Sequence, residues 1–270
     1  GHALPEGAAQ QTIRLAMRKS RNDAVLRPGA ALPEGWLVYA VGDIHGRTDL
    51  LADLQARIAE DAASRPATRR TVIYLGDYVD RGPDSRDVVG RLIEAPLADF
   101  ESVHLLGNHE EFMLRFLEDE SVGESWMANG GAETLASYGI DPLARVPGES
   151  LMAMLQHELR RRLPTRHLAF LRGLSLSFRA GGYYFVHAGI RPGIALEAQQ
   201  QQDMLWIREA FLDSDASHGA VIVHGHSIRR RPERRENRIG VDTGAYASGH
   251  LTALALEAAE GGVSERFLQT

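Results

Sequence analysis

Hydrophobic residues along the chain occur in short runs, each ending in a turn of glycine and polar residues and followed by helical spacing. The first run is 36–41, and runs at 71–75 and 103–106 repeat the order. After the first run the apolar face of the expected helix is Leu50, Leu51, Leu54 and Ile58, with Thr48 as the expected N-cap. Three such units in succession indicate an α/β domain whose polar turns meet at one edge of a sheet.

The rest of the chain is expected to hold a helical insertion, further strands and an N-terminal arm. Residues 121–172, with helices expected at 126–138 and 151–163, are interpreted as a cap over the site. Further strands are expected at 174–178, 183–186, 220–223, 239–242 and 251–256, forming a second, more antiparallel sheet with a hairpin turn at Gly181-Gly182. Residues 1–34 are interpreted as a peripheral arm and 35–270 as the main domain.

Composition excludes several classes of protein. The chain has 270 residues, 44% of them apolar, which is enough for one large core. Thirty basic against 36 acidic residues give a net charge of −6, so no stable nucleic-acid partner is expected. With no cysteine, disulfides, thiolate metal sites and cysteine nucleophiles are excluded. The longest apolar run is far shorter than the roughly 20 residues of a membrane helix, so we expect no membrane partner and a cytoplasmic enzyme.

Candidate metal ligands stand in the turns after these runs. The candidates, in chain order, are Asp43, His45, Asp77, Asp80, Asn108, His109, His187, His224 and His226. One aspartate and histidine turn is as readily a capped turn as a metal site, but several turns meeting at one sheet edge favour a metal. Oxygen and imidazole donors suit manganese, iron or zinc.

These motifs together resemble a known family. The chain contains, in order, Gly42-Asp-Ile-His-Gly46, Gly76-Asp-Tyr-Val-Asp-Arg-Gly82, Gly107-Asn-His-Glu110, His187-Ala-Gly189 and Gly225-His226. From residue 36 to the C-terminus it resembles the phosphoprotein phosphatases, of the bacterial serine/threonine type, within the calcineurin-like metallophosphoesterases. The resemblance implies an α/β fold: a β-sandwich of two mixed sheets flanked by helices, with a helical cap insertion.

The resemblance also implies a site with two divalent ions, Mn²⁺ being expected and iron or zinc the alternatives. It assigns Asp43 and His45 to one ion, Asn108, His187 and His226 to the other, and Asp77 as the bridge. A hydroxide shared by the ions would attack phosphorus in line. Arg81 and Arg208 would bind the phosphate, and His109, oriented by Asp80, would act as general acid. Arg81 could instead form a structural ion pair, and His109 with Asp80 could merely stiffen the turns.

Several residues have a less definite meaning. His224 is left over when His226 is taken as the ligand, and it is assigned to a supporting position beside the ligands. Many nucleases and phosphodiesterases of the wider superfamily have histidine where this chain has Ile228, which favours the phosphatase branch. The arginine-rich run 229–238 is typical of a solvated loop, and the alternative is a basic rim that attracts phosphorylated protein, polyphosphate or nucleotide. Gly130 and Gly131 would let a cap loop approach the metals.

The sequence therefore predicts a metal-dependent phosphatase for phosphate monoesters, with phosphoserine and phosphothreonine in proteins as the first candidate substrates. The expected partners are a phosphorylated protein or a small phosphoester. Dinucleoside polyphosphate hydrolysis, diadenosine tetraphosphate included, is the enzymatic alternative, because such enzymes end in a tract similar to Val241-Asp-Thr-Gly-Ala245. A phosphate-binding pseudophosphatase is the other alternative, and the complete ligand set argues against it.

Overall fold

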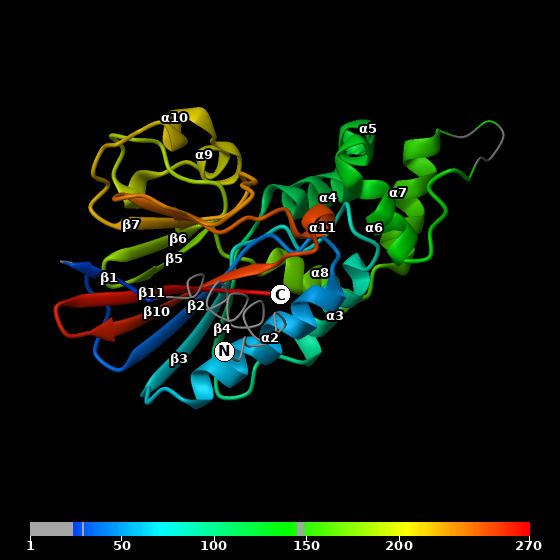
Figure 1. The fold of residues 1–270 in the computed structure, drawn as a ribbon. Coiled ribbons are helices and arrows are strands. Elements are labelled where there is room, and N and C mark those ends of the chain that lie inside the picture. Colours follow the sequence, from blue (N-terminus) through cyan, green and yellow to red (C-terminus); the bar gives the residue numbers. More distant parts are fainter. Residues whose placement is uncertain (1–23, 29, 145–147, 149) are drawn as a thin grey trace, which may run out of the picture.

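Two β-sheets pack face to face, with helices covering the outer face of one of them (Figure 1). The structure is a computed structural model that describes residues 24–28, 30–144, 148 and 150–270. Among these residues, no helix combines the length and apolar character needed to cross a bilayer.

The first sheet is built around three parallel strands. Its six strands lie in the order β1 (Val25–Pro28), β11 (Gly262–Gln269), β10 (Thr252–Ala259), β2 (Trp36–Val41), β3 (Arg69–Tyr74) and β4 (Glu101–His104). Strands β2, β3 and β4 are parallel, with Val41 beside Tyr74 and Tyr74 beside His104. Because the three strands end side by side, the turns that follow them lie at one edge of the sheet.

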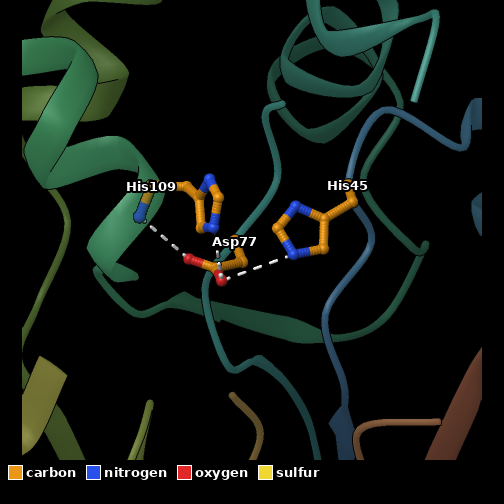
Figure 2. A group of neighbouring side chains, drawn as sticks. All are labelled: His45, Asp77 and His109. Atoms are coloured by element: carbon orange, nitrogen blue, oxygen red, sulfur yellow. Dashed lines mark hydrogen bonds and ion pairs between the residues drawn. The ribbon is translucent and has the colours of Figure 1, made fainter. Parts of the chain in front are cut away.

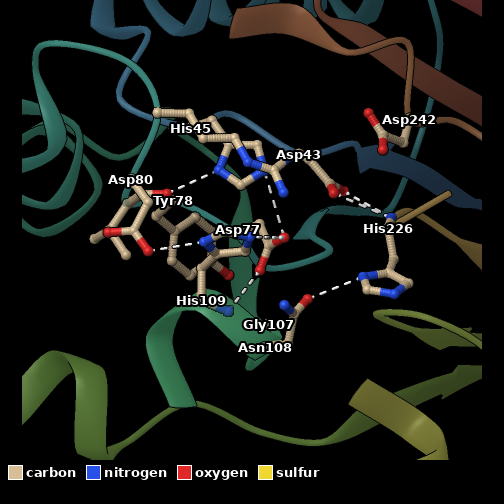
Figure 3. A network of polar contacts seen from close by, with 12 residues as sticks. Asp43, His45, Asp77, Tyr78, Asp80, Gly107, Asn108, His109, His226 and Asp242 are labelled. Atoms are coloured by element: carbon tan, nitrogen blue, oxygen red, sulfur yellow. Dashed lines mark hydrogen bonds and ion pairs between the residues drawn. The ribbon is translucent and has the colours of Figure 1, made fainter. Parts of the chain in front are cut away.

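The second sheet is also mixed. Its strands lie in the order β5 (Ser177–Ala180), β6 (Tyr183–Val186), β7 (Val221–His224), β9 (Arg238–Gly240) and β8 (Glu233–Arg234). The three inner strands, β6, β7 and β9, are parallel. Their ends present residues 187, 225–226 and 241–242 toward the turns of the first sheet, as the ribbon and the contacts described below show (Figures 1 and 3).

Helices occupy the outer layers. The elements beside the first sheet are α2 (Thr48–Ala63), α3 (Ser85–Glu94), α4 (Asn108–Glu118), η1 (Glu120–Val122), α5 (Gly123–Trp126), the π-helical segment η2 (Met127–Gly131), α6 (Ala132–Ser137), α7 (Leu151–Arg162) and α8 (Thr165–Arg172). The remaining helices are η3 (Leu196–Ala198), α9 (Gln201–Trp206), α10 (Glu209–Leu212) and α11 (Ala245–Ser248).

Strand alternation explains the layers. Along β2, Tyr39 packs with the helices of the outer layer, whereas Val38 and Ala40 face the core between the sheets. Phe185 of β6 and Val223 of β7 enter that same central core from the second sheet. A strand buried on both faces is apolar throughout, which is why the run 36–41 shows no alternation in the sequence. The predicted α/β fold with two mixed sheets flanked by helices is confirmed.

The assignment of strands to sheets was partly wrong. The predicted strand 251–256 corresponds to β10, which pairs antiparallel with β2 in the first sheet. The second sheet has two parallel and two antiparallel pairings, so it is not the more antiparallel sheet. The long crossover that contains α9 and α10 joins β6 to β7 and thereby makes them parallel.

The helix start at Thr48 also differs from the prediction. Thr48 is the first residue of α2, Arg47 occupies the capping position, and no side chain caps this end. The main-chain N–H of Leu51 donates to the Arg47 carbonyl, which fixes where the helix begins.

The described residues of the expected arm, and helices of the expected cap, pack against the rest of the fold. Residues 1–23 and 29 of the arm lie outside the described residues, but β1 pairs with β11 at the edge of the first sheet and Leu32 is buried between the sheets. In the insertion, α7 and α8 pack into the same core as α4. Within the insertion, Trp126 of α5 and Thr134 of α6 donate hydrogen bonds to Asp80, which lies in the turn after β3. The division into arm, domain and cap stays a prediction.

Candidate metal centre

The turns after the strands hold their backbone in an unusual conformation. Among the described residues, six other than glycine have positive φ, and the predicted site supplies all but Asp99: His45, Asp77, Asp80, Arg81 and His226. A positive φ is unfavourable for residues that carry a Cβ, because the side chain clashes with the backbone. It persists where surrounding contacts hold it, which is typical of functional sites.

Asp77 lies between two groups of histidines. Its Oδ2 is 3.5 Å from Nε2 of His45 and 3.9 Å from Nε2 of His109 (Figure 2). Its Oδ1 is 3.5 Å from Nε2 of His187. Ligating atoms of His45, Asp77 and His109 form one compact group, and those of Asp77, His187 and His226 form another, each within 4.8 Å. One carboxylate is therefore shared by two potential metal sites.

Backbone carbonyls fix two of the histidines in a ligand-ready form. Nδ1 of His45 lies 2.8 Å from the Val79 carbonyl, and Nδ1 of His187 lies 2.9 Å from the Leu75 carbonyl. A carbonyl oxygen can only accept, so each ring carries its proton on Nδ1. The lone pair on Nε2 then faces the centre. This arrangement orients metal-binding histidines in proteins.

Asn108 brings the second group together. Its Oδ1 lies 2.9 Å from Nε2 of His187 and 2.9 Å from Nδ1 of His226. The oxygen and the unprotonated Nε2 of His187 are both acceptors, so a cation between them would relieve their repulsion. Burial lowers the pKa of His226 to about 2 and also lowers that of His187. Neutral imidazole is the form that binds metals.

A carboxylate that the sequence analysis did not single out stands beside Asp43. Both oxygens of Asp43 accept from the main-chain N–H of His226, at 3.2 and 3.0 Å, and Asp242 lies beside them (Figure 3). Burial, followed by Asp242 and Asp77, raises the pKa of Asp43, and burial raises that of Asp242 to about 6. The only earlier indication of Asp242 was its place in the tract 241–245.

The residues present fit divalent ions. The six predicted ligands are all buried, and the structure brings them into one cluster. The donors are oxygen and imidazole nitrogen, and the carboxylates outnumber nearby cations, so positive ions would offset charge that burial makes costly. The assignment of each residue as a ligand stays a prediction.

His109 forms a buried pair with Asp80. Its Nδ1 donates to Oδ2 of Asp80 at 2.7 Å. The same carboxylate accepts from Nε1 of Trp126 at 2.9 Å and from Oγ1 of Thr134 at 2.6 Å. Burial alone would lower the pKa of His109, but Asp77 and Asp80 outweigh burial and raise it. His109 therefore keeps a proton more readily than an ordinary histidine while its Nε2 faces the centre.

Glu110 is a positioning residue that sequence analysis missed. Its carboxylate accepts from main-chain N–H groups of Asp77, Tyr78 and Val79 at 2.7 to 3.1 Å, and from that of Gly107 at 3.1 Å. A Cβ on Gly107 would lie 2.2 Å from Oδ1 of Asp77, so only glycine fits there. Glu110 thus ties the second turn to the third. In the sequence, Glu110 is recognisable only as the last residue of the Gly107-Asn-His-Glu110 motif.

The two predicted phosphate-binding arginines line one cavity. Arg81 and Arg208 border a volume of about 330 Å³ together with His226 and Tyr246. Arg81 donates from Nη1 to Nε2 of His45 at 3.2 Å, and its guanidinium carbon is 5.0 Å from the centre of the Tyr246 ring. Neither arginine forms an ion pair with any described residue, so the alternative of a structural ion pair for Arg81 gains no support. Tyr246 was not singled out from the sequence.

The expected contact between the cap glycines and the metals takes a different form. Gly130 has φ of 103°, and its carbonyl accepts from the main-chain N–H of Arg81 at 3.1 Å. A Cβ there would lie 2.6 Å from that nitrogen. Gly131 packs against the ring of Trp126. The glycines therefore let the segment approach the backbone of Arg81.

His224 lies behind the ligand turn. Its Nδ1 donates to the Gly225 carbonyl at 3.0 Å, and its ring meets Phe211 edge-on with centroids 5.1 Å apart. Within the described residues it has no hydrogen bond to the predicted ligands, so its contact with the site runs through the backbone of Gly225.

The arginine-rich run has two different parts. Arg234 pairs with Glu265 at 3.3 Å, and Arg238, which is buried, pairs with Glu233 at 3.1 Å. Residues 229–231 are exposed. The run is therefore exposed at residues 229–231 and again at 235–236, whereas Arg234 and Arg238 hold β8 and β9 in place.

Comparisons with known proteins agree with this geometry. The chain is 28% identical over 224 residues to "Serine/threonine-protein phosphatase 2" of Salmonella typhimurium, covering 80% of this chain and 90% of that protein. It is 24% identical over 231 residues to "Bis(5'-nucleosyl)-tetraphosphatase PrpE [asymmetrical]" of Halalkalibacterium halodurans, covering 79% and 87%. A protein serine/threonine phosphatase structure from Saccharomyces cerevisiae shares the fold, with a TM-score of 0.51, 13% identity and coverage of 100% and 91%.

A family model described as "Calcineurin-like phosphoesterase" matches residues 37–251. This range contains the strands that carry the polar turns and all of the clustered histidines and carboxylates. The chain therefore belongs to the calcineurin-like phosphoesterase family.

Proposed function

We propose that the chain is a phosphatase that acts with two divalent metal ions, and we expect both ions to be Mn²⁺. The observation that carries this proposal is the placement of Asp77, whose two oxygens face two separate groups of histidines. The proposed ligands are Asp43 and His45 for one ion, Asn108, His187 and His226 for the other, and Asp77 for both.

Two bound divalent ions would supply a nucleophilic hydroxide at neutral pH and neutralise charge on the phosphoryl group. Arg81 and Arg208 would hold the non-bridging phosphoryl oxygens, since a guanidinium can donate two parallel hydrogen bonds. When the oxygen nucleophile bonds to phosphorus, the bond to the leaving oxygen breaks and its electron pair stays on that oxygen. His109 would donate a proton from Nε2 to it, and Asp80 would stabilise the positive ring before transfer.

For the substrate, we propose phosphoserine and phosphothreonine in proteins as the first candidate. Similarity to a serine/threonine-protein phosphatase supports this class. Dinucleoside polyphosphates are the second candidate. A third arginine, Arg229, in the cavity beside the centre favours them, as does similarity to a bis(5'-nucleosyl)-tetraphosphatase.

A substrate panel tests the proposal. The protein loaded with Mn²⁺ would be assayed with a phosphoserine peptide, diadenosine tetraphosphate and p-nitrophenyl phosphate, and kcat/KM compared, with Fe²⁺ and Zn²⁺ in parallel. We expect turnover of at least one natural type of substrate, abolished by chelation and restored by metal. Protein that binds two ions per chain and turns over none of these substrates would instead be a phosphate-binding protein.

A further inference from the structure

We propose that the cavity beside the candidate metal centre is a second phosphate subsite, in which Arg229 binds a phosphoryl group joined by an anhydride bond to the one being cleaved. This inference rests on the proposed function and selects the polyphosphate class of substrate.

The cavity is continuous with the centre. Its volume is about 330 Å³, and its lining includes the proposed ligand His226, as well as Arg81, Arg208 and Arg229. A phosphoryl group held between the ions and Arg81 would therefore have its neighbour in a phosphoanhydride chain pointing toward or into this space.

The arginines of the cavity are available for a ligand. Within the described part of the chain, none of the three guanidiniums has a carboxylate oxygen within 4.0 Å. Later arginines of the same run are different, because Arg234 and Arg238 are paired with glutamates. Arg81 donates one hydrogen bond to Nε2 of His45 and has further donors. A guanidinium without a carboxylate partner beside a phosphate site is suited to bind phosphoryl oxygens in pairs.

Two carboxylates also line the cavity. With Glu209 and Asp213 present, the three arginines leave an excess of one positive charge. A phosphoryl group inside a dinucleoside polyphosphate carries one negative charge and two non-bridging oxygens, which matches this excess and lets one guanidinium donate to both oxygens. The carboxylate of an acidic peptide residue has the same charge and the same number of oxygens, but its flexible side chain has to be ordered to reach the cavity, whereas an anhydride bond already holds the second phosphate beside the first. The cavity therefore favours a second phosphate over an acidic peptide residue.

The backbone fixes where Arg229 stands. Its main-chain N–H donates to the Asp242 carbonyl at 3.0 Å. Two residues before Arg229, the N–H of Ser227 donates to the Gly225 carbonyl at 2.6 Å and closes the turn that carries His226. Arg230 is as exposed as Arg229 but does not line the cavity. It is therefore a matched control with the same charge, one residue away.

The test compares Arg229→Ala with Arg230→Ala. The quantity is the ratio of kcat/KM for diadenosine tetraphosphate to kcat/KM for p-nitrophenyl phosphate. We expect Arg229→Ala to lower this ratio about 10-fold or more, mainly through KM, which corresponds to about 1.4 kcal/mol. Arg229→Lys should lower this ratio by a smaller factor than Arg229→Ala, because lysine keeps the positive charge but cannot donate the paired hydrogen bonds of a guanidinium. Arg230→Ala should change it less than about 2-fold.

Binding of tripolyphosphate to the metal-free protein gives a second readout that does not depend on turnover. Arg229→Ala should weaken the calorimetric Kd by about 10-fold, and Arg230→Ala by much less.

Three results would overturn the subsite. These are an unchanged ratio in Arg229→Ala, equal losses in both variants, or a larger loss on an acidic phosphoserine peptide than on the dinucleotide. If the metal-loaded wild-type protein hydrolysed no substrate, the proposed function would fail, while tripolyphosphate binding would still decide whether the subsite exists.

Discussion

The two sides of the candidate metal centre stabilise buried carboxylates in different ways. On one side, Asp80 accepts hydrogen bonds from the side chains of His109, Trp126 and Thr134, which come from α4, α5 and α6. On the other side, Asp43 and Asp242 lie together, and their hydrogen-bond donors are main-chain N–H groups of residues 226 and 244.

This difference indicates which side depends on metal. Burial raises the pKa of Asp80, but its three side-chain donors and the neighbouring His109 offset part of that effect and favour the anion. Without a cation, ionising both of two adjacent carboxylates in a buried site is unfavourable, because the two negative charges repel each other and neither is solvated by water. We therefore expect bound ions to stabilise the Asp43 side more than the His109 side.

The largest effect is expected at Asp77, where the two sides meet. Asp77→Asn removes a negative charge from between the two proposed ions and should lower kcat/KM by about 10²-fold or more, with reduced metal content. Metal analysis and kinetics on the same preparation measure both. If the variant bound two ions per chain and turned over normally, Asp77 would not be the bridge.

Removal of His109 should affect substrates according to their leaving group. His109→Ala should slow a phosphoserine peptide by about 10²- to 10⁴-fold, because a serine alkoxide needs a proton, and slow p-nitrophenyl phosphate much less. Asp80→Asn should give the same pattern more mildly. Metal content is the control and should stay unchanged. Equal slowing of both substrates would exclude the acid role.

The contribution of Asp242 to the stability of the metal-free protein should fall as pH rises. The pKa of Asp242 is raised from 3.8 to about 6, so between these values the folded protein holds a proton that the unfolded chain has lost. The share of the free energy of unfolding that Asp242 contributes should therefore decrease over this window, by about 1 to 3 kcal/mol. Buried histidines such as His226, whose pKa is lowered, contribute with the opposite sign, so the measured quantity is the difference in the free energy of unfolding between the metal-free wild type and Asp242→Asn, followed by urea unfolding at several pH values.

Bound Mn²⁺ should remove most of this pH dependence, because the ions replace the proton as the compensating charge. An identical slope in the wild type and Asp242→Asn would mean that the carboxylate pair does not control the stability of that side.

A smaller effect is expected from single donors to Asp80. Trp126→Phe removes one hydrogen bond and keeps the ring that packs against Phe116 at 5.0 Å between centroids. The two donors that remain should limit the loss in kcat on a phosphoserine peptide to about 3- to 10-fold. Trp36→Phe is the control, since Trp36 stacks under the Arg69 guanidinium at the start of β2, the end of that strand away from the site. The same loss in both variants would point to general packing.

The local sequence was sufficient to predict which side chains assemble. Parallel strands of similar length end at one sheet edge, so residues that directly follow apolar runs, such as Asp43, Asp77 and Asn108, have to lie close together. Glycines on either side restrict these turns. Spacing along the chain predicts this part of the site, whereas the grouping of His187 and His226 with these residues was implied by the family resemblance.

Only the tertiary structure decided what surrounds these ligands. Contacts between segments far apart in the sequence place β10 in the first sheet and Asp242 beside Asp43. Such contacts also place Arg229 at a cavity and bury Arg238. Similar charges on neighbouring residues give no indication of which one is paired or buried. For charged residues such as those of 229–238, burial and pairing are set by strand order and packing, and the hydrophobic pattern along the chain does not distinguish them.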